Sequence, residues 1–210
     1  MSAAVTKVPS QARSLRTYDA ILDAAEALLQ ERAFSEITTS EIATKAGVTT
    51  GAIYGRFKSK DDLLPHLYGR YLNWIDTSVP RWFSSVDWRT KSADEAAEHV
   101  AKTIVRLHKA RPWLIRAMVL YVRETTRGDS DRTLDHSQLV CCILTSLREC
   151  KDGDRASDAS LVFAVHTALT VAREVIVFSD TPMARAVSKD KRSLQFRIAR
   201  IIETALIADL

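Results

Sequence analysis

Two helix-start signals separated by a single glycine constrain the fold more than any other feature of the sequence. Thr38 is followed three residues later by Glu41, which is the spacing of a capping box at the beginning of a helix. Gly47 stands where a helix can end in a left-handed residue, and Thr49 or Thr50 can cap a second short helix directly after it. Two short helices joined by a tight glycine turn are typical of a helix-turn-helix.

The rest of the sequence favours helices as well. The 210 residues contain only 6 glycines and 5 prolines, which is about half of the usual share of these turn-forming residues. Hydrophobic residues make up 46% and charged residues 27%, as in an ordinary globular chain. No segment indicates a strand, so we expect an all-α protein. Apolar side chains recur at spacings of three and four, which predicts helices over residues 16–32, 92–110, 112–124, 134–150, 157–178 and 187–208.

Two prolines interrupt the pattern between the helix-turn-helix signals and residue 92. Ser59 can cap a helix that continues towards Pro80. Pro65 is expected either to kink this helix or to delay its start, because proline has no backbone N–H to donate. Pro80 is expected to end the helix, and residues 80–91 are expected to be irregular or to form a short helix.

Charge, apolar length and cysteine content limit the classes of function. The net charge of +4 and the pI near 9.0 permit a polyanionic partner without requiring one. No uncharged apolar run approaches the ~18 residues of a membrane span, and the first residues lack the apolar core of a secretory signal. Cys141, Cys142 and Cys150 are odd in number and lack the spacing of a zinc site. We therefore expect a cytoplasmic protein with reduced thiols, no membrane partner and no metal.

Residues 37–64 read ITTSEIATKAGVTTGAIYGRFKSKDDLL, and this stretch resembles the DNA-binding domain of the TetR family of bacterial transcriptional regulators. The resemblance rests on the preceding amphipathic helix, the Thr-Thr cap, Ile-Ala-x-x-Ala-Gly-Val, Tyr-x-x-Phe and Lys-x-Lys-x-x-Leu. It implies an N-terminal helix-turn-helix domain of three helices over residues 14–60. A larger helical bundle for ligand binding and dimerisation follows over residues 61–210. Residues 1–13 are polar and basic, and they are expected to form a flexible tail.

The second helix of such a motif enters the major groove of DNA, where its first residues contact base edges. Thr49 and Thr50 occupy that place, and the small residues Gly51 and Ala52 allow a close approach to DNA. The resemblance implies that further polar and basic side chains contact phosphates or bases. The candidate DNA-binding residues are Thr38, Thr39, Ser40, Thr49, Thr50, Gly51, Ala52, Tyr54, Arg56, Lys58 and Lys60.

Several of these residues have a second interpretation. Tyr54 could pack in the core together with Phe57, which lies three residues later. Lys58 and Lys60 could form a solvated pair of charges. Ser40 occupies a position where some members of the family have a long base-reading side chain, so direct readout can be absent there.

The C-terminal residues carry no recognisable motif, and a ligand cavity among them follows from the resemblance alone. Aromatic and soft side chains are the candidate pocket residues, with plain core packing as the alternative: Trp82, Trp113, Met118, Tyr121, Phe163 and His166. The last two predicted helices carry more apolar surface than one bundle readily covers, so we expect a homodimer. The candidate interface residues are Leu161, Ala168, Ala172, Leu194, Ile198, Ile201 and Ala205.

The histidines show neither the spacing of metal ligands nor a triad with a nucleophile, so we expect no enzyme activity and no cofactor. The sequence predicts a ligand-responsive repressor that binds an inverted-repeat operator in double-stranded DNA as a homodimer. A small hydrophobic or aromatic effector is expected to release it. The alternative is a small-molecule-binding protein or enzyme with a vestigial DNA-binding domain, and activation in place of repression is a milder alternative.

Overall fold

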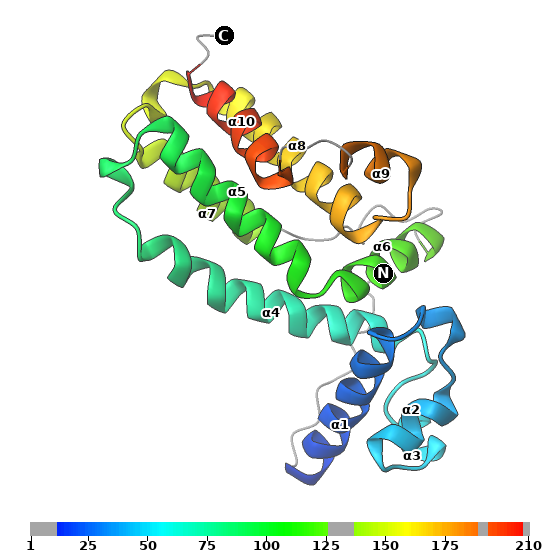
Figure 1. Cartoon of the computed structure of the whole chain (residues 1–210). Coiled ribbons are helices and arrows are strands. Elements are labelled where there is room, and N and C mark those ends of the chain that lie inside the picture. The colour runs from blue at the N-terminus through cyan, green and yellow to red at the C-terminus, as the bar shows by residue number, and fades with distance from the viewer. Residues whose placement is uncertain (1–11, 126–136, 189–192, 208–210) are drawn as a thin grey trace. The chain divides into compact units, whose positions relative to one another are not determined.

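The structure, a computed structural model, describes residues 12–125, 137–188 and 193–207 (Figure 1). Within these residues every regular element is helical, as the sequence predicts. The α-helices are α1 (Ala12–Leu29), α2 (Thr39–Ala46), α3 (Thr50–Tyr54), α4 (Leu63–Ser84), α5 (Ala93–Ala110), α6 (Pro112–Thr125), α7 (Ser137–Glu149), α8 (Asp158–Val177), α9 (Pro182–Ser188) and α10 (Leu194–Ile207). Short 3₁₀ helices occupy three of the connections: η1 (Phe34–Glu36), η2 (Trp88–Thr90) and η3 (Gly153–Arg155).

The chain forms two compact units. The N-terminal unit comprises residues 1–71 and 113–133, and the bundle unit comprises residues 72–112 and 134–210. The chain passes from one unit to the other within α4, and again at the start of α6. Most of the predicted tail, residues 1–11, lies outside the described residues, whereas its last two residues belong to α1.

The core of the N-terminal unit forms where the apolar face of α1 meets the helix-turn-helix. Ile21 and Leu22 of α1 are fully buried, as are Ile42 of α2 and Ile53 of α3. Packing of these helices removes their apolar side chains from water, which is the main source of stability for such short elements.

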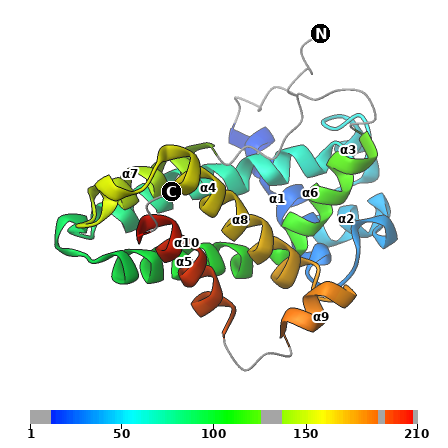
Figure 2. The ribbon, with the colours of Figure 1, turned by 90° about the horizontal axis from the view of Figure 1, so that it is seen from above.

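The bundle unit is built around α5, α8 and α10, which lie side by side (Figures 1 and 2). Each contributes a buried stripe, with Ile104 on α5, Val165 and Ala168 on α8, and Ile198 on α10. By length and apolar composition alone α8 could cross a membrane. Its inward residues are buried against neighbouring helices of the same unit.

The two prolines behave differently. Pro65 delays the start of its helix: α4 begins at Leu63, so Pro65 falls in the first turn, where a backbone N–H would have no partner in the helix. Pro80 does not end α4, and this expectation was wrong, since the helix continues to Ser84. The last turn persists because Phe83 is buried and stacks on Trp88, with ring centroids 5.5 Å apart. The Trp88 indole N–H also donates a 2.9 Å hydrogen bond to the Phe83 carbonyl oxygen.

The predicted final helix over residues 187–208 was also wrong in extent. Its N-terminal part belongs to the separate short helix α9, and α10 begins only at Leu194. Residues 189–192, between the two, lie outside the described residues, as do residues 134–136 at the predicted start of α7.

Candidate DNA-binding surface

A capping box begins α2, as the sequence predicts. The Glu41 backbone N–H donates to the Thr38 hydroxyl oxygen at 3.2 Å, while the Thr38 N–H donates to the Glu41 carboxylate at 2.8 Å. The Thr38 hydroxyl and Arg32 donate to the same carboxylate at 2.7 and 2.9 Å. Led by the bond from the Thr38 backbone, these contacts lower the pKa of Glu41 from 4.5 to about 2. The start of α2 is therefore fixed by a charged network.

The turn between the two short helices depends on Gly47. This residue has a φ of 66°, in the left-handed region that glycine adopts without a steric penalty. Thr49 then caps α3, since its hydroxyl accepts a hydrogen bond from the Ala52 backbone N–H at 3.2 Å. The helix α3 ends at Tyr54, so the candidate recognition helix is only 5 residues long.

The outer surface of the helix-turn-helix carries hydroxyl groups and small side chains. The Tyr54 side chain is 56% exposed, whereas Phe57 is buried, so Tyr54 is not a core residue. Its hydroxyl lies 3.3 Å from that of Thr39, which brings together the end of α3 and the start of α2. Two adjacent hydroxyls can hydrogen-bond one phosphate group. The remaining exposed candidates over these helices are Thr38, Ser40, Thr49, Thr50 and Gly51.

Two of the candidate cationic side chains form hydrogen bonds within the chain. Lys60 donates to the carbonyl oxygens of Phe34 and Ile37, both at 2.8 Å, and its ammonium lies 4.7 Å from the centroid of the Phe34 ring. Arg56 donates to the Ala52 carbonyl oxygen at 2.9 Å and to the Ser14 hydroxyl at 3.3 Å. These contacts support the chain around α3 and engage N–H donors of both half-buried cations within the protein.

Lys58 differs from both of these cations. Its side chain is exposed and makes no hydrogen bond or ion pair with the residues that the structure describes. Sequence spacing alone did not separate Lys58 from Lys60, because the separation depends on where the loop before α2 lies.

An aromatic cluster that the sequence did not reveal holds the end of the motif. Tyr18 stacks on Phe57 at 5.7 Å, and His66 meets both rings edge-on at 5.6 and 5.3 Å. The Tyr18 hydroxyl lies 2.8 Å from Nδ1 of His66. Burial lowers the pKa of His66, and the nearby Asp62 carboxylate opposes this shift. The cluster ties α1, the residues after α3 and the start of α4 into one unit.

The six predicted ligand-pocket residues do not come together in one pocket of the bundle unit. Trp82 packs against Trp74, with the Arg106 guanidinium 4.2 Å above its ring, and Phe163 is 75% exposed. The other three aromatic or soft residues, Trp113, Met118 and Tyr121, lie on α6 in the N-terminal unit. Only His166 lines the largest described pocket, of about 730 Å³, together with His108, Ser137, Val140, Cys141, Leu144, Thr145, Leu169, Thr170 and Arg173.

The predicted interface residues divide into two groups. Leu161, Ala168, Ala172 and Ile198 are buried inside the bundle of a single chain, because they form the inward stripes of α8 and α10. Leu194, Ile201 and Ala205 are half-buried. The last two line a shallow groove of about 460 Å³ between α8 and α10, together with Ser160, Phe163, Ala164, Arg200 and Thr204.

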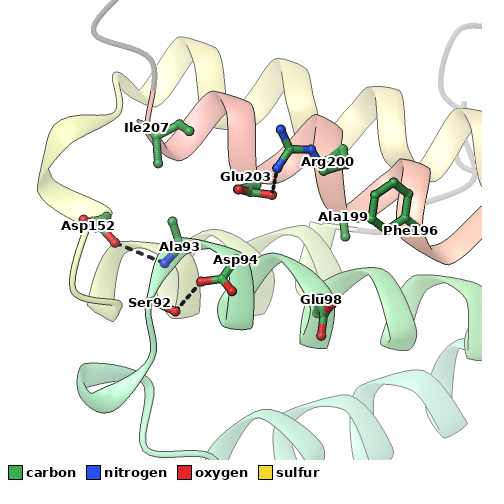
Figure 3. A pocket seen from close by; sticks show the side chains of 10 residues that line it. All are labelled: Ser92, Ala93, Asp94, Glu98, Asp152, Phe196, Ala199, Arg200, Glu203 and Ile207. Atoms are coloured by element: carbon green, nitrogen blue, oxygen red, sulfur yellow. Dashed lines mark hydrogen bonds and ion pairs between the residues drawn. The ribbon is translucent and has the colours of Figure 1, made fainter.

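A further pocket, of about 510 Å³, lies between α5 and α10 and is rich in carboxylates (Figure 3). Most of its charges already have partners: Glu203 pairs with Arg200 at 2.7 Å, and Asp152 accepts a 3.1 Å hydrogen bond from the Ala93 backbone N–H. The Ser92 hydroxyl donates to Asp94. These contacts hold the start of α5 and give most of the charged side chains of this pocket a structural role.

Comparison with known proteins identifies the helix-turn-helix. Residues 21–67 match the family model described as bacterial regulatory proteins, tetR family. The repressor BepR of Brucella suis is 44% identical over 61 residues, which are 29% of each chain. The repressor KstR2 of Mycolicibacterium smegmatis is 36% identical over 79 residues, 34% of this chain and 38% of that protein. The chain thus matches well under half of the length of these curated relatives.

Solved structures share the fold of nearly the whole chain. A TetR-family regulator from Mesorhizobium loti has a TM-score of 0.62 at 15% identity, over 93% of this chain and 96% of that one. The regulator FadR of Bacillus subtilis, solved in complex with stearoyl-CoA, has a TM-score of 0.53 at 20% identity, over 92% and 99% of the two chains. The all-α architecture, with an N-terminal helix-turn-helix and a helical C-terminal domain, is therefore confirmed.

Proposed function

We propose that the chain, whose residues 21–67 match the tetR family of bacterial regulatory proteins, represses transcription by binding an inverted-repeat operator as a homodimer. One observation carries the proposal: the turn at Gly47 presents α3 with an exposed, polar and sterically small surface. An α-helix of this kind fits the major groove, where hydroxyls can reach base edges and phosphates. The protein acts in the cytoplasm, where the operator is found.

The contacts to DNA divide by chemistry. Thr49, Thr50 and Gly51 at the start of α3 approach the bases, because they are exposed and short. The adjacent hydroxyls of Thr39 and Tyr54 bind a phosphate group, which positions the helix without reading sequence. The exposed ammonium of Lys58 adds an electrostatic contact to the backbone of the DNA.

The dimer forms through the outward faces of α8 and α10. Phe163 is 75% exposed on α8, beside a groove that Ile201 and Ala205 of α10 also line. Large apolar side chains at this exposure favour a partner surface that removes them from water. A two-fold axis through these helices pairs each face with its copy and presents two recognition helices to two half-sites.

Release by a small molecule requires that the ligand bind more tightly to the conformer that does not fit the operator. A coupling of about 1–3 kcal/mol between the two sites is typical of such regulators. The alternative, a small-molecule-binding protein with a vestigial DNA-binding domain, is disfavoured because the capping box, the Gly47 turn and the Thr49 cap are all intact.

Selection of random duplex DNA on the purified protein tests the proposal. We expect enrichment of an inverted repeat whose half-sites are set by the two-fold axis of the dimer. Absence of enrichment at low salt, from protein shown to be folded and dimeric, would leave the vestigial-domain alternative as the better account.

A further inference from the structure

The pocket between α5, α7 and α8 has the size and composition of a small-molecule site. Its volume of about 730 Å³ falls within the range of typical ligand pockets, roughly 300–1,000 Å³. Its lining joins apolar side chains to a few polar and basic ones, which all come from the bundle unit. The basic and the apolar side chains of this lining favour different parts of a ligand.

The charge of the pocket is one-sided. Arg173 is half-buried in its wall, and the described residues that line the pocket include no aspartate or glutamate. Among the described residues, Arg173 makes no hydrogen bond or ion pair. Other arginines of the bundle unit differ, since Arg148 pairs with Asp158 and Arg200 pairs with Glu203. A guanidinium that is partly removed from water without a counter-charge favours an anion, and its planar fork matches a carboxylate.

The floor beside this arginine is aliphatic. Val140 and Leu144 are four residues apart on α7 and therefore share one face of that helix. On α8, Leu169 lies four residues before Arg173 and three residues after His166, so the three side chains form a single row. An apolar body can lie along Val140, Leu144 and Leu169 while its charged end meets Arg173.

We propose that this pocket binds a small carboxylate with an apolar body, and that Arg173 is the residue that recognises the carboxylate. That this ligand is also the effector rests on the proposed function. His108 connects the pocket to the rest of the chain, because it lies in the last turn of α5, five residues before Trp113, where the N-terminal unit resumes. Its Nδ1 hydrogen bonds to the Ile104 carbonyl oxygen at 2.8 Å, which fixes the ring in the pocket wall.

Calorimetric titration of the full chain with octanoate, and with octanamide as its uncharged counterpart, tests the proposal. We expect octanoate to bind and octanamide to bind about tenfold more weakly or worse, because the amide cannot form a charge-assisted pair with Arg173. In Arg173→Gln, octanoate should lose about tenfold or more in affinity while octanamide is unchanged. Arg185→Gln, which removes an exposed arginine of α9 outside the pocket, serves as the control and should bind as the parent does.

Three results would overturn the proposal. They are equal binding of octanoate and octanamide, unchanged octanoate affinity in a folded Arg173→Gln variant, and no binding of octanoate, 4-phenylbutyrate or benzoate at millimolar concentration. A parallel titration with the selected operator separates the two claims. Carboxylate binding without operator binding would support the ligand-pocket proposal and contradict the proposed regulator function. Operator binding without carboxylate binding would contradict only the ligand-pocket proposal.

Discussion

The two units of the molecule expose different kinds of surface. Over its helix-turn-helix, the N-terminal unit exposes hydroxyls and small side chains such as Thr49, Thr50 and Gly51. The bundle unit exposes large apolar side chains along two helices, with Phe163 on α8 and Phe196 on α10. Interfaces with DNA are polar and hydrated, whereas homodimer interfaces are more apolar. The contrast therefore supports the proposal that DNA binds the first surface and a second copy of the chain binds the other.

Loss of the dimer should have the largest effect. Phe163→Glu places a charge on the apolar face, and we expect monomers by light scattering and a loss of operator affinity of about 100-fold or more, because two linked half-sites no longer bind together. Met183→Glu, at an exposed residue of α9, is the control and should remain dimeric. If Phe163→Glu remained dimeric, the dimer interface would have to lie on another face of the chain.

Substitutions of the two lysines near α3 should affect different properties, one the stability of the N-terminal unit and the other the binding of DNA. Lys60→Met removes two hydrogen bonds to backbone carbonyl oxygens, and it should lower the free energy of unfolding of the N-terminal unit by about 1–3 kcal/mol in urea titrations. Lys58→Met should leave stability unchanged and reduce the salt dependence of operator binding by about one phosphate contact. The reverse pattern would show that Lys60 turns outwards to DNA.

Removal of the Tyr54 hydroxyl should have a smaller effect. Tyr54→Phe is expected to weaken binding by about 0.5–1.5 kcal/mol, equally for the operator and for unrelated DNA, because a phosphate contact carries no sequence information. Fluorescence anisotropy with both duplexes measures this. A change in base preference would instead place Tyr54 against a base.

The capping box of α2 should give the smallest effect, a local dependence on pH. The pKa of Glu41 is about 2 in the folded chain and 4.5 otherwise, so its stabilising effect is present above pH 4.5 and is lost as the pH falls towards 2. Hydrogen exchange of α2 should become faster as the pH falls through this range. In Glu41→Gln this pH dependence should be absent. Glu95→Gln, in the corresponding box of α5, should alter exchange of α5 alone. Equal effects of both variants on α2 would contradict the assignment.

Local chemistry explains which parts of the fold were predictable. The boxes at Thr38 and Ser92 and the turn at Gly47 involve residues only a few positions apart, so the sequence predicted these helix boundaries. The continuation of α4 past Pro80 was not predictable, because it depends on the contact of Phe83 with Trp88 in a separate element.

The candidate functional residues also differ in whether local sequence or contacts between distant segments determine their placement. Exposed hydroxyls on short helices followed from the local pattern, whereas the inward turn of Lys60 depends on carbonyl oxygens more than twenty residues away in the chain. Of the predicted pocket residues, His166 and Phe163 line two different described pockets, because aromatic content does not reveal which side chains face a cavity. The sequence analysis did not single out Arg173, although its spacing from His166 and Leu169 on α8 places the three side chains in one row.

In the proposed complex, two copies of the chain bind one inverted repeat through two recognition helices. Sedimentation of the protein with the selected duplex, and with a duplex of equal length that keeps only one half-site, tests it most directly. We expect one dimer on the inverted repeat and weaker binding to the single half-site. One protomer per inverted repeat, or equal affinity for the two duplexes, would contradict it.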